Sequence, residues 1–136
     1  MMNTVSAMRA LVLSSFANQY IVPIVGKALS DAGIDTIDLS DVTASGAKRM
    51  NAILDAIHEA DLIVVELSDQ SPNVMYELGI AHAFRKPAVI LVDRYSPSKL
   101  PSDLAGFGYL VYDRNKPDEL ARELRSWIPS FSASRG

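Results

Sequence analysis

The chain has 136 residues, of which 49% are hydrophobic, and this matches the size and apolar content of one globular domain. Its net charge is only −3 and its basic residues form no stripe, so nucleic acid is not expected as a partner. The chain contains no cysteine and only two histidines, so disulfides, thiolate catalysis and a metal site are not expected. No apolar run approaches the roughly 20 residues that span a bilayer, and no secretory signal is visible. We therefore expect a soluble, cytoplasmic protein without a membrane partner.

The first predicted strand covers residues 10–13. An amphipathic helix follows over residues 21–32, with Pro23 near its first turn and Gly33 just after its end. A short second strand is predicted at residues 34–39, and a polar loop follows it.

The next helix is predicted from apolar residues at i, i+3, i+4 and i+7, namely Met50, Ile53, Leu54 and Ile57. The third strand, residues 62–67, is almost wholly apolar and is therefore expected in the centre of the sheet. Ser71 and Pro72 then have the residue types of an N-cap and a first helical position. This helix is predicted to end near residues 85–86, before a proline.

The fourth strand is predicted at residues 88–92, and residues 93–108 have the composition of a long loop. The fifth strand, residues 109–112, precedes a last helix that begins at Pro117 and is expected to close at Pro129. We expect residues 1–129 to form a single nucleotide-binding α/β domain and residues 130–136 to form a flexible tail.

The alternation of strands and helices predicts a three-layer α/β sandwich. Right-handed crossovers favour a flavodoxin-like parallel sheet of five strands in the order 2-1-3-4-5. In such a sheet, ligands bind at the carboxyl ends of the first and third strands, where the strand order reverses. Residues that follow these two strands are therefore the first candidates for a site.

Glu77 is a carboxylate where the helix pattern calls for an apolar side chain. At roughly 100° per residue, the apolar side chains of its helix span a sector of about 160°, and Glu77 lies near the middle of it. A carboxylate so placed costs free energy unless a function uses it. The structural alternative is that Glu77 turns to the rim and bonds a backbone amide or an arginine. The topology places Glu77 near Ser14, Ser15 and Phe16, which leave the first strand.

A long motif surrounds Glu77. It reads ADLIVVELSD over residues 60–69 and SPNVMYELGIAHAFRKP over residues 71–87, and LPSDLAG follows at residues 100–106. This pattern resembles the signature of bacterial TIR-like proteins that are predicted to bind nucleotides. These are similar in turn to the nucleoside 2-deoxyribosyltransferases, which share the shorter ELG-x-A core. The resemblance covers most of the chain and implies the same flavodoxin-like fold.

The resemblance implies a role for Glu77. In the deoxyribosyltransferases, the glutamate of this core attacks the anomeric carbon of the sugar, and TIR-type NAD hydrolases use a helix-borne glutamate against the nicotinamide–ribose bond. Breaking an N-glycosidic bond builds positive charge on the sugar, which an ionised carboxylate stabilises or attacks. The resemblance thus implies a catalytic Glu77, a nucleoside, nucleotide or NAD ligand, and no required cofactor. Two deoxyribosyltransferase features differ here: Ser71-Pro72-Asn73 replaces an Asp-Gly pair, and the loop after the first strand lacks glycine.

The other candidate ligand contacts each have a structural alternative. Asn73 is predicted to bond a ribose hydroxyl or orient Glu77, or else to cap its helix. Asp69 is predicted to contact a base or sugar, or else to support a turn. Tyr76 is predicted to stack on a base, or else to pack half-buried. The predicted substrate-binding set comprises Ser14, Ser15, Phe16, Asp69, Asn73 and Tyr76.

Two functions from different classes remain open at this point. The chain is an enzyme acting on an N-glycosidic bond, or it is a non-catalytic TIR-like module for nucleotide sensing or assembly. A phospho-receiver domain is disfavoured because Leu13-Ser14-Ser15 supplies no acidic pair after the first strand. We expect a homodimer or larger homo-oligomer, with contact through residues 93–108 or through the helix of Glu77, where Met75 and Tyr76 offer apolar area.

Overall fold

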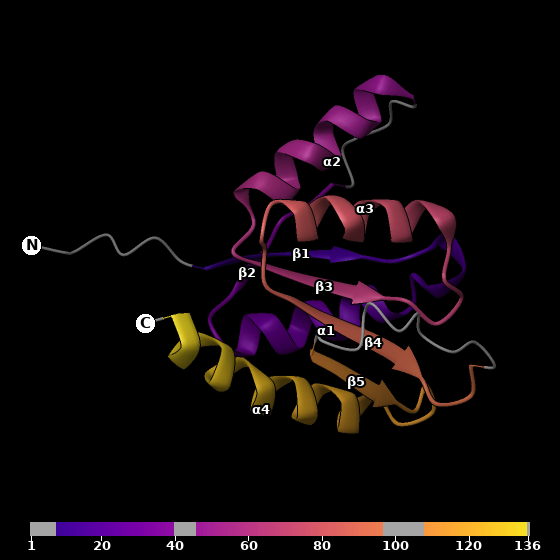
Figure 1. Ribbon diagram of the computed structural model, residues 1–136. Coiled ribbons are helices and arrows are strands. Elements are labelled where there is room, and N and C mark those ends of the chain that lie inside the picture. Colours follow the sequence, from indigo (N-terminus) through magenta and orange to yellow (C-terminus); the bar gives the residue numbers. More distant parts are fainter. Residues whose placement is uncertain (1–7, 40–45, 97–107, 136) are drawn as a thin grey trace, which may run out of the picture.

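The computed structural model describes residues 8–39, 46–96 and 108–135. It contains a five-stranded parallel sheet in the order β2-β1-β3-β4-β5, which confirms the predicted fold class (Figure 1). The strands are β1 (Arg9–Leu13), β2 (Asp35–Thr36), β3 (Leu62–Glu66), β4 (Ala88–Asp93) and β5 (Gly108–Tyr112). The helices are α1 (Ile21–Asp31), α2 (Ala47–Glu59), α3 (Pro72–Ala83) and α4 (Pro117–Arg135), with a 3₁₀ turn η1 (Phe16–Asn18) before α1.

Strand β3 is the centre of the sheet, as its apolar sequence predicts. All five of its residues are buried, since helices cover both faces of a parallel sheet. It pairs with β1, with Leu13 opposite Val65, and with β4, where Leu91 lies opposite Glu66. The carboxyl ends of β1 and β3 therefore lie side by side at the edge where a ligand is expected.

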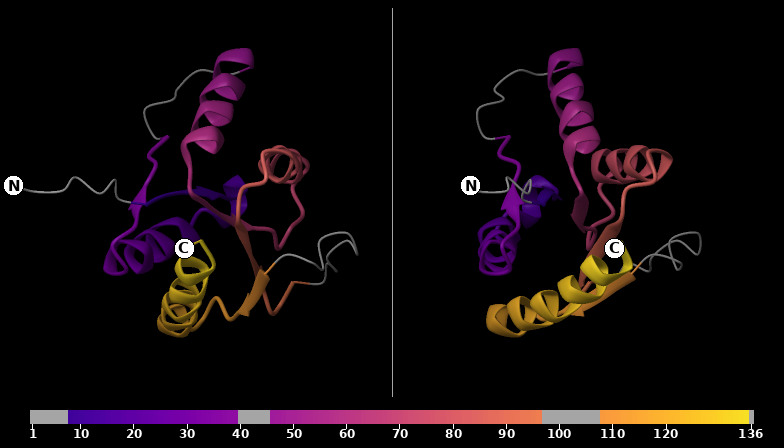
Figure 2. Two further views of the ribbon diagram at one scale, coloured as in Figure 1. Left: turned by 60° about the vertical axis from the view of Figure 1, so that its left-hand side comes forward. Right: turned by 90° about the vertical axis from the view of Figure 1, so that its left-hand side faces the viewer.

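Helices cover the two faces of the sheet in pairs, as the views in Figures 1 and 2 show. On one face α1 and α4 form a core with Leu62 and Val64 of β3. On the other face α2 and α3 pack against Ile63 and Val65. Helix α2 leans away from the sheet toward its N-terminal end. Residues at the N-terminal end of α2 line the candidate functional site.

Strand β2 is shorter than the predicted residues 34–39. Asp35 and Thr36 pair with β1, and Ile37 donates its N–H to the carbonyl of Ala10. Within the described residues 34–39, no strand pairing with β1 follows Thr36. An edge strand is held by hydrogen bonds on one side only, so its pairing ends easily where the chain turns toward α2.

Two helices end at residues other than those predicted. Helix α3 ends at Ala83, because Arg85 adopts a left-handed conformation (φ 58°) and the N–H of Lys86 bonds the carbonyl of Ala81. Helix α4 continues past Pro129 to Arg135, so a proline that removes one N–H donor does not end it. The mobility expected for residues 130–136 stays a prediction. Within the described ranges, none of the helices is both long and apolar enough to cross a bilayer.

Candidate functional site

Glu77 lies in the second turn of α3, which begins at Pro72 after Ser71 as the sequence predicts. Its half-buried side chain lines a cavity of about 310 Å³. The connection from β1 to α1 forms the facing wall with Ser14, Ser15 and Phe16, and Asn73 lines it one turn before Glu77. The structure thus brings most of the predicted site residues together at the carboxyl edge of the sheet.

The cavity continues toward β2 as a second hollow of about 690 Å³. The residues that line both hollows are Ser14, Gln19, Arg49, Ile53 and Glu77. The second hollow also reaches Asp38, which follows β2. Both volumes lie within the roughly 300–1,000 Å³ of small-molecule sites. Glu77 therefore stands where the two hollows meet.

Two aromatic side chains stand at the rim of the first cavity. Phe16 is 89% exposed and Tyr76 is 61% exposed, and both residues line the cavity. The half-buried packing weighed for Tyr76 is therefore wrong. Exposed rings beside a polar cavity offer faces on which a planar base can stack. Met75, expected on the outer side of α3, instead packs partly buried against the core formed with α2.

Asp69 is the one predicted contact that lies outside the cavity lining. Its side chain is exposed and accepts a hydrogen bond of 3.3 Å from the backbone N–H of Ser71. This bond shapes the turn between β3 and α3, which is the structural alternative weighed for this residue.

Two opposing influences set the charge of Glu77. Burial raises the pKa of its carboxyl, and the positive charge of Arg49 lowers it, with a net shift upward. Arg49 was not among the predicted site residues. It lies one turn before Ile53, which is buried against α3, so this i, i+4 spacing on the inward side of α2 was the available signal.

A second carboxylate, Glu66, was also missed. It ends β3 on the face of α1 and α4 and is fully buried. It accepts hydrogen bonds from the hydroxyl of Tyr112 and the N–H of Ser68. The Tyr112 hydroxyl is also bonded to that of Tyr20, at 2.8 Å, and Tyr20 is partly exposed just before α1. Burial raises the pKa of Glu66, and the bond from Tyr112 partly offsets this.

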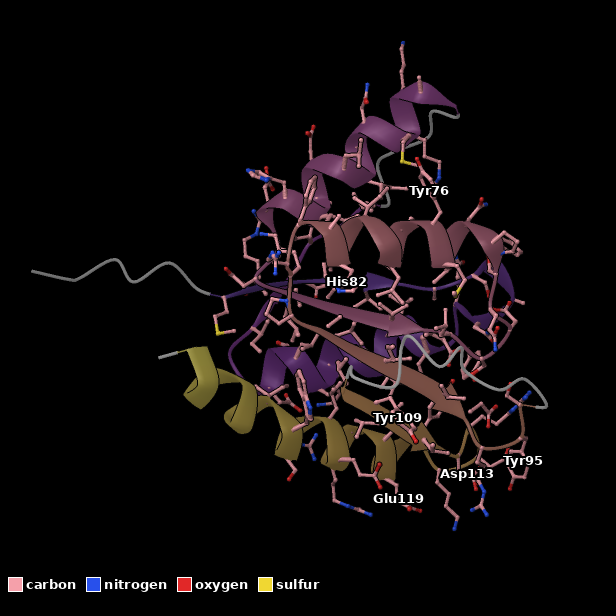
Figure 3. The ribbon with its side chains drawn as sticks, in the orientation of Figure 1. Tyr76, His82, Tyr95, Tyr109, Asp113 and Glu119 are labelled. Carbon is pink, nitrogen blue, oxygen red and sulfur yellow. The ribbon has the colours of Figure 1, made fainter. Side chains whose placement is uncertain are left out.

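The arginines that follow β4 and β5 are engaged in ion pairs. Arg114 donates to the buried Asp93 at 2.6 Å, and Arg94 lies 4.0 Å from Asp113. Figure 3 shows Asp113 beyond β5, well apart from Tyr76 on α3. These cations therefore do not serve the cavity of Glu77.

Metal-binding side chains do not gather in the part of the chain that the structure describes. Among residues 8–39, 46–96 and 108–135, no three histidine, aspartate or glutamate side chains are placed to hold an ion. His82 is exposed on α3, outside the lining of the cavity (Figure 3).

Comparison with known proteins shows which solved structures share this fold. No protein-family model matches the sequence, and no curated protein matches it either. The fold is similar to that of a CMP N-glycosidase from Clostridium botulinum (TM-score 0.69, 20% identity, covering 88% of this chain and 98% of that one). It is also similar to the TIR domain of a Toll-related receptor from Hydra magnipapillata (TM-score 0.65, 18% identity, 93% and 98% covered). A third similar structure is a 2-deoxyribosyltransferase from Bacillus psychrosaccharolyticus (TM-score 0.60, 16% identity, 80% and 95% covered). These likenesses confirm the predicted relation in fold to TIR-like and deoxyribosyltransferase-like proteins.

Proposed function

We propose that the chain binds a nucleoside, a nucleotide or NAD beside α3 and cleaves or transfers at its N-glycosidic bond through Glu77. The observation that carries the proposal is the position of Glu77, half-buried in a cavity at the point where the strand order reverses. Support comes from the fold, which is shared with a CMP N-glycosidase and a 2-deoxyribosyltransferase.

The proposed reaction needs only groups that the chain supplies. The bond between the anomeric carbon and the base nitrogen breaks, and its electron pair stays on that nitrogen. A purine or pyrimidine base then takes up a proton from the medium, whereas the nicotinamide of NAD leaves as a neutral molecule without one. The ionised carboxylate of Glu77 bonds to the anomeric carbon or stabilises its positive charge. Water then completes hydrolysis, or a second base completes transfer. No electron leaves or enters the substrate, so no redox cofactor is required.

The neighbours of Glu77 have matching roles in this proposal. The exposed rings of Phe16 and Tyr76 stack on the base. Asn73, Ser14 and Ser15 supply amide and hydroxyl groups to the sugar. The carboxylate of Glu77 must be ionised to act, and the charge of Arg49 favours that form against the effect of burial.

The proposal is tested by incubating the purified protein separately with NAD, nucleosides and nucleoside monophosphates and following free base by liquid chromatography. We expect one class of ligand to release its base, and addition of a different free base to reveal transfer as a new nucleoside product. Saturable binding without any release from the whole panel would contradict the catalytic proposal.

A non-catalytic, TIR-like module for nucleotide sensing or assembly is the second candidate. The likeness to a TIR domain over 93% of the chain favours it. The two exposed aromatic rings on the same side of the molecule also suit contact with another protein surface. Binding of nucleotide without turnover is the outcome that would distinguish it.

We expect the chain to form a homodimer or larger assembly through α3, because the cavity beside Glu77 is open and catalysis at a glycosidic bond gains from exclusion of water. Residues 97–107 of the other predicted contact segment lie outside the described residues. Light scattering at micromolar concentration should give at least twice the chain mass of 14.8 kDa, and Tyr76→Ser should lower it.

The matched control for this prediction is Tyr109→Ser, which removes another exposed ring from β5 and should leave the mass unchanged. A mass near 14.8 kDa with and without nucleotide would contradict self-association.

A further inference from the structure

Arg49 and Glu77 face the same cavity with opposite charges but are not joined as an ion pair. Among the residues that the structure describes, they are the only charged ones that line the first hollow. In the described part of the chain, Arg49 takes part in none of the six ion pairs. The positive charge of Arg49 nevertheless acts on Glu77, because it lowers the pKa of that carboxyl. The cavity thus offers one cationic and one anionic wall.

The helix fixes where Arg49 stands. It lies in the first turn of α2, one turn before Ile53, whose side chain is buried in the core between α2 and α3. Lys48 is the adjacent residue on the same turn, also exposed, and it does not line either hollow. The position of each residue on the helix therefore decides that Arg49 lines the cavity and Lys48 does not.

The hydroxyl groups around Arg49 suit an anion with several oxygens. Ser71 lines the same hollow with Ser14 and Ser15, and each hydroxyl can donate one hydrogen bond, either to the phosphate or to the sugar that carries it. Among the described residues, the second hollow is lined by Asp38 and Glu77 as well as Arg49, so an anion there meets two carboxylates and one arginine. The charges thus direct a negative group of the ligand to the first hollow, near Arg49.

We propose that the site takes a phosphorylated nucleoside in preference to the free nucleoside, with the phosphate bound by Arg49 and the sugar carbon facing Glu77. This inference rests on the proposed function and specifies its substrate class. The planar guanidinium donates two parallel hydrogen bonds to phosphate oxygens, which an ammonium cannot reproduce. The sugar then lies between a cation that holds its phosphate and a carboxylate that meets the charge developing on its ring.

The test measures binding by calorimetry in a Glu77→Gln background, which prevents turnover. The ligands are two pairs that differ only by the phosphate: AMP with adenosine, and CMP with cytidine. For at least one pair we expect the monophosphate to bind about tenfold or more tightly than the nucleoside. Arg49→Gln should bring that ratio close to one, mainly by weakening the monophosphate, and Arg49→Lys should restore only part of it.

Lys48→Gln is the matched control, because it removes a cation from the same turn without changing the cavity. It should leave the ratio intact, and the circular dichroism of all variants should coincide because both side chains are exposed. The phosphate-dependent part of binding should also weaken as salt is raised.

Three results would overturn the inference: a ratio near one in the parent protein, an equal loss for both ligands in Arg49→Gln, or a loss as large in Lys48→Gln. Absence of binding for all four ligands would overturn it as well. Base release by the wild-type protein from nucleosides alone would uphold the proposed function and reject the phosphate preference. Phosphate-dependent binding without base release from any ligand would uphold the phosphate preference and reject the proposed function.

Discussion

Glu77→Gln is expected to lower the rate of base release by roughly a thousandfold or more, the range seen when a nucleophile is removed. The amide has nearly the shape of the carboxylate but carries no negative charge, so it neither attacks the sugar carbon nor stabilises its positive charge. Because burial already penalises the ionised form of Glu77, the neutral amide should not destabilise the fold. Initial rates of base release and urea unfolding of the same preparations check both parts.

The matched control is Glu123→Gln, which neutralises an exposed carboxylate on α4 that lines neither hollow. Its rate should equal that of the wild type. If Glu77→Gln and Glu123→Gln both keep the wild-type rate, Glu77 is excluded as the nucleophile. The preparations should then be checked for a contaminating enzyme.

Tyr112→Phe is expected to lower the free energy of unfolding by about 1–3 kcal/mol at pH 8, because it removes the hydroxyl that donates to the buried carboxylate of Glu66. The loss should be smaller at pH 5. A carboxyl whose pKa is raised by folding contributes stability that is present below its unfolded pKa and is lost as the pH rises through its folded pKa. Removing the Tyr112 hydroxyl raises the folded pKa further, so more stability is lost at the higher pH. Urea unfolding at both pH values measures this difference.

Tyr20→Phe is the companion variant. It removes the Tyr20 hydroxyl, which bonds Tyr112, but leaves the bond from Tyr112 to Glu66 in place. The loss in the free energy of unfolding should therefore be smaller and depend less on pH. Equal losses for Tyr112→Phe at pH 5 and pH 8 would show that Glu66 does not change its protonation between them.

The sheet order could be predicted because β3 is a continuous apolar run and because strands and helices alternate regularly. The ends of β2 and α4 could not be predicted with the same accuracy. The pairing of β2 is limited to Asp35 and Thr36 by hydrogen bonds to one neighbour, which no pattern in residues 34–39 reveals. Likewise, Pro129 is a helix breaker by its own chemistry, yet α4 continues through it.

The position of Glu77 could be predicted because a carboxylate interrupts the apolar side of its helix. Glu66 interrupts an apolar strand in the same way. Its partner Tyr112, however, lies 46 positions away along the chain, and Tyr20 lies 92 positions from the Tyr112 that it bonds. The spacing of Arg49 and Ile53 places both on one side of α2, but only the packing of α2 against α3 shows that this side borders the cavity. The sequence motif around Glu77 thus indicates the centre of the site, and side chains from distant elements complete it.

The hydroxyl chain from Glu66 to Tyr20 has a direction, and that direction depends on one proton. With Glu66 ionised, Tyr112 donates inward to the carboxylate and Tyr20 donates inward to Tyr112. With Glu66 protonated, its own O–H can donate to Tyr112, Tyr112 to Tyr20, and the partly exposed Tyr20 to water, so that every hydroxyl remains bonded. One protonation event in the sheet interior thereby reverses the polarity of a hydrogen-bonded wire that ends at the start of α1, and gives the buried carboxyl a path for proton exchange with solvent without opening the core.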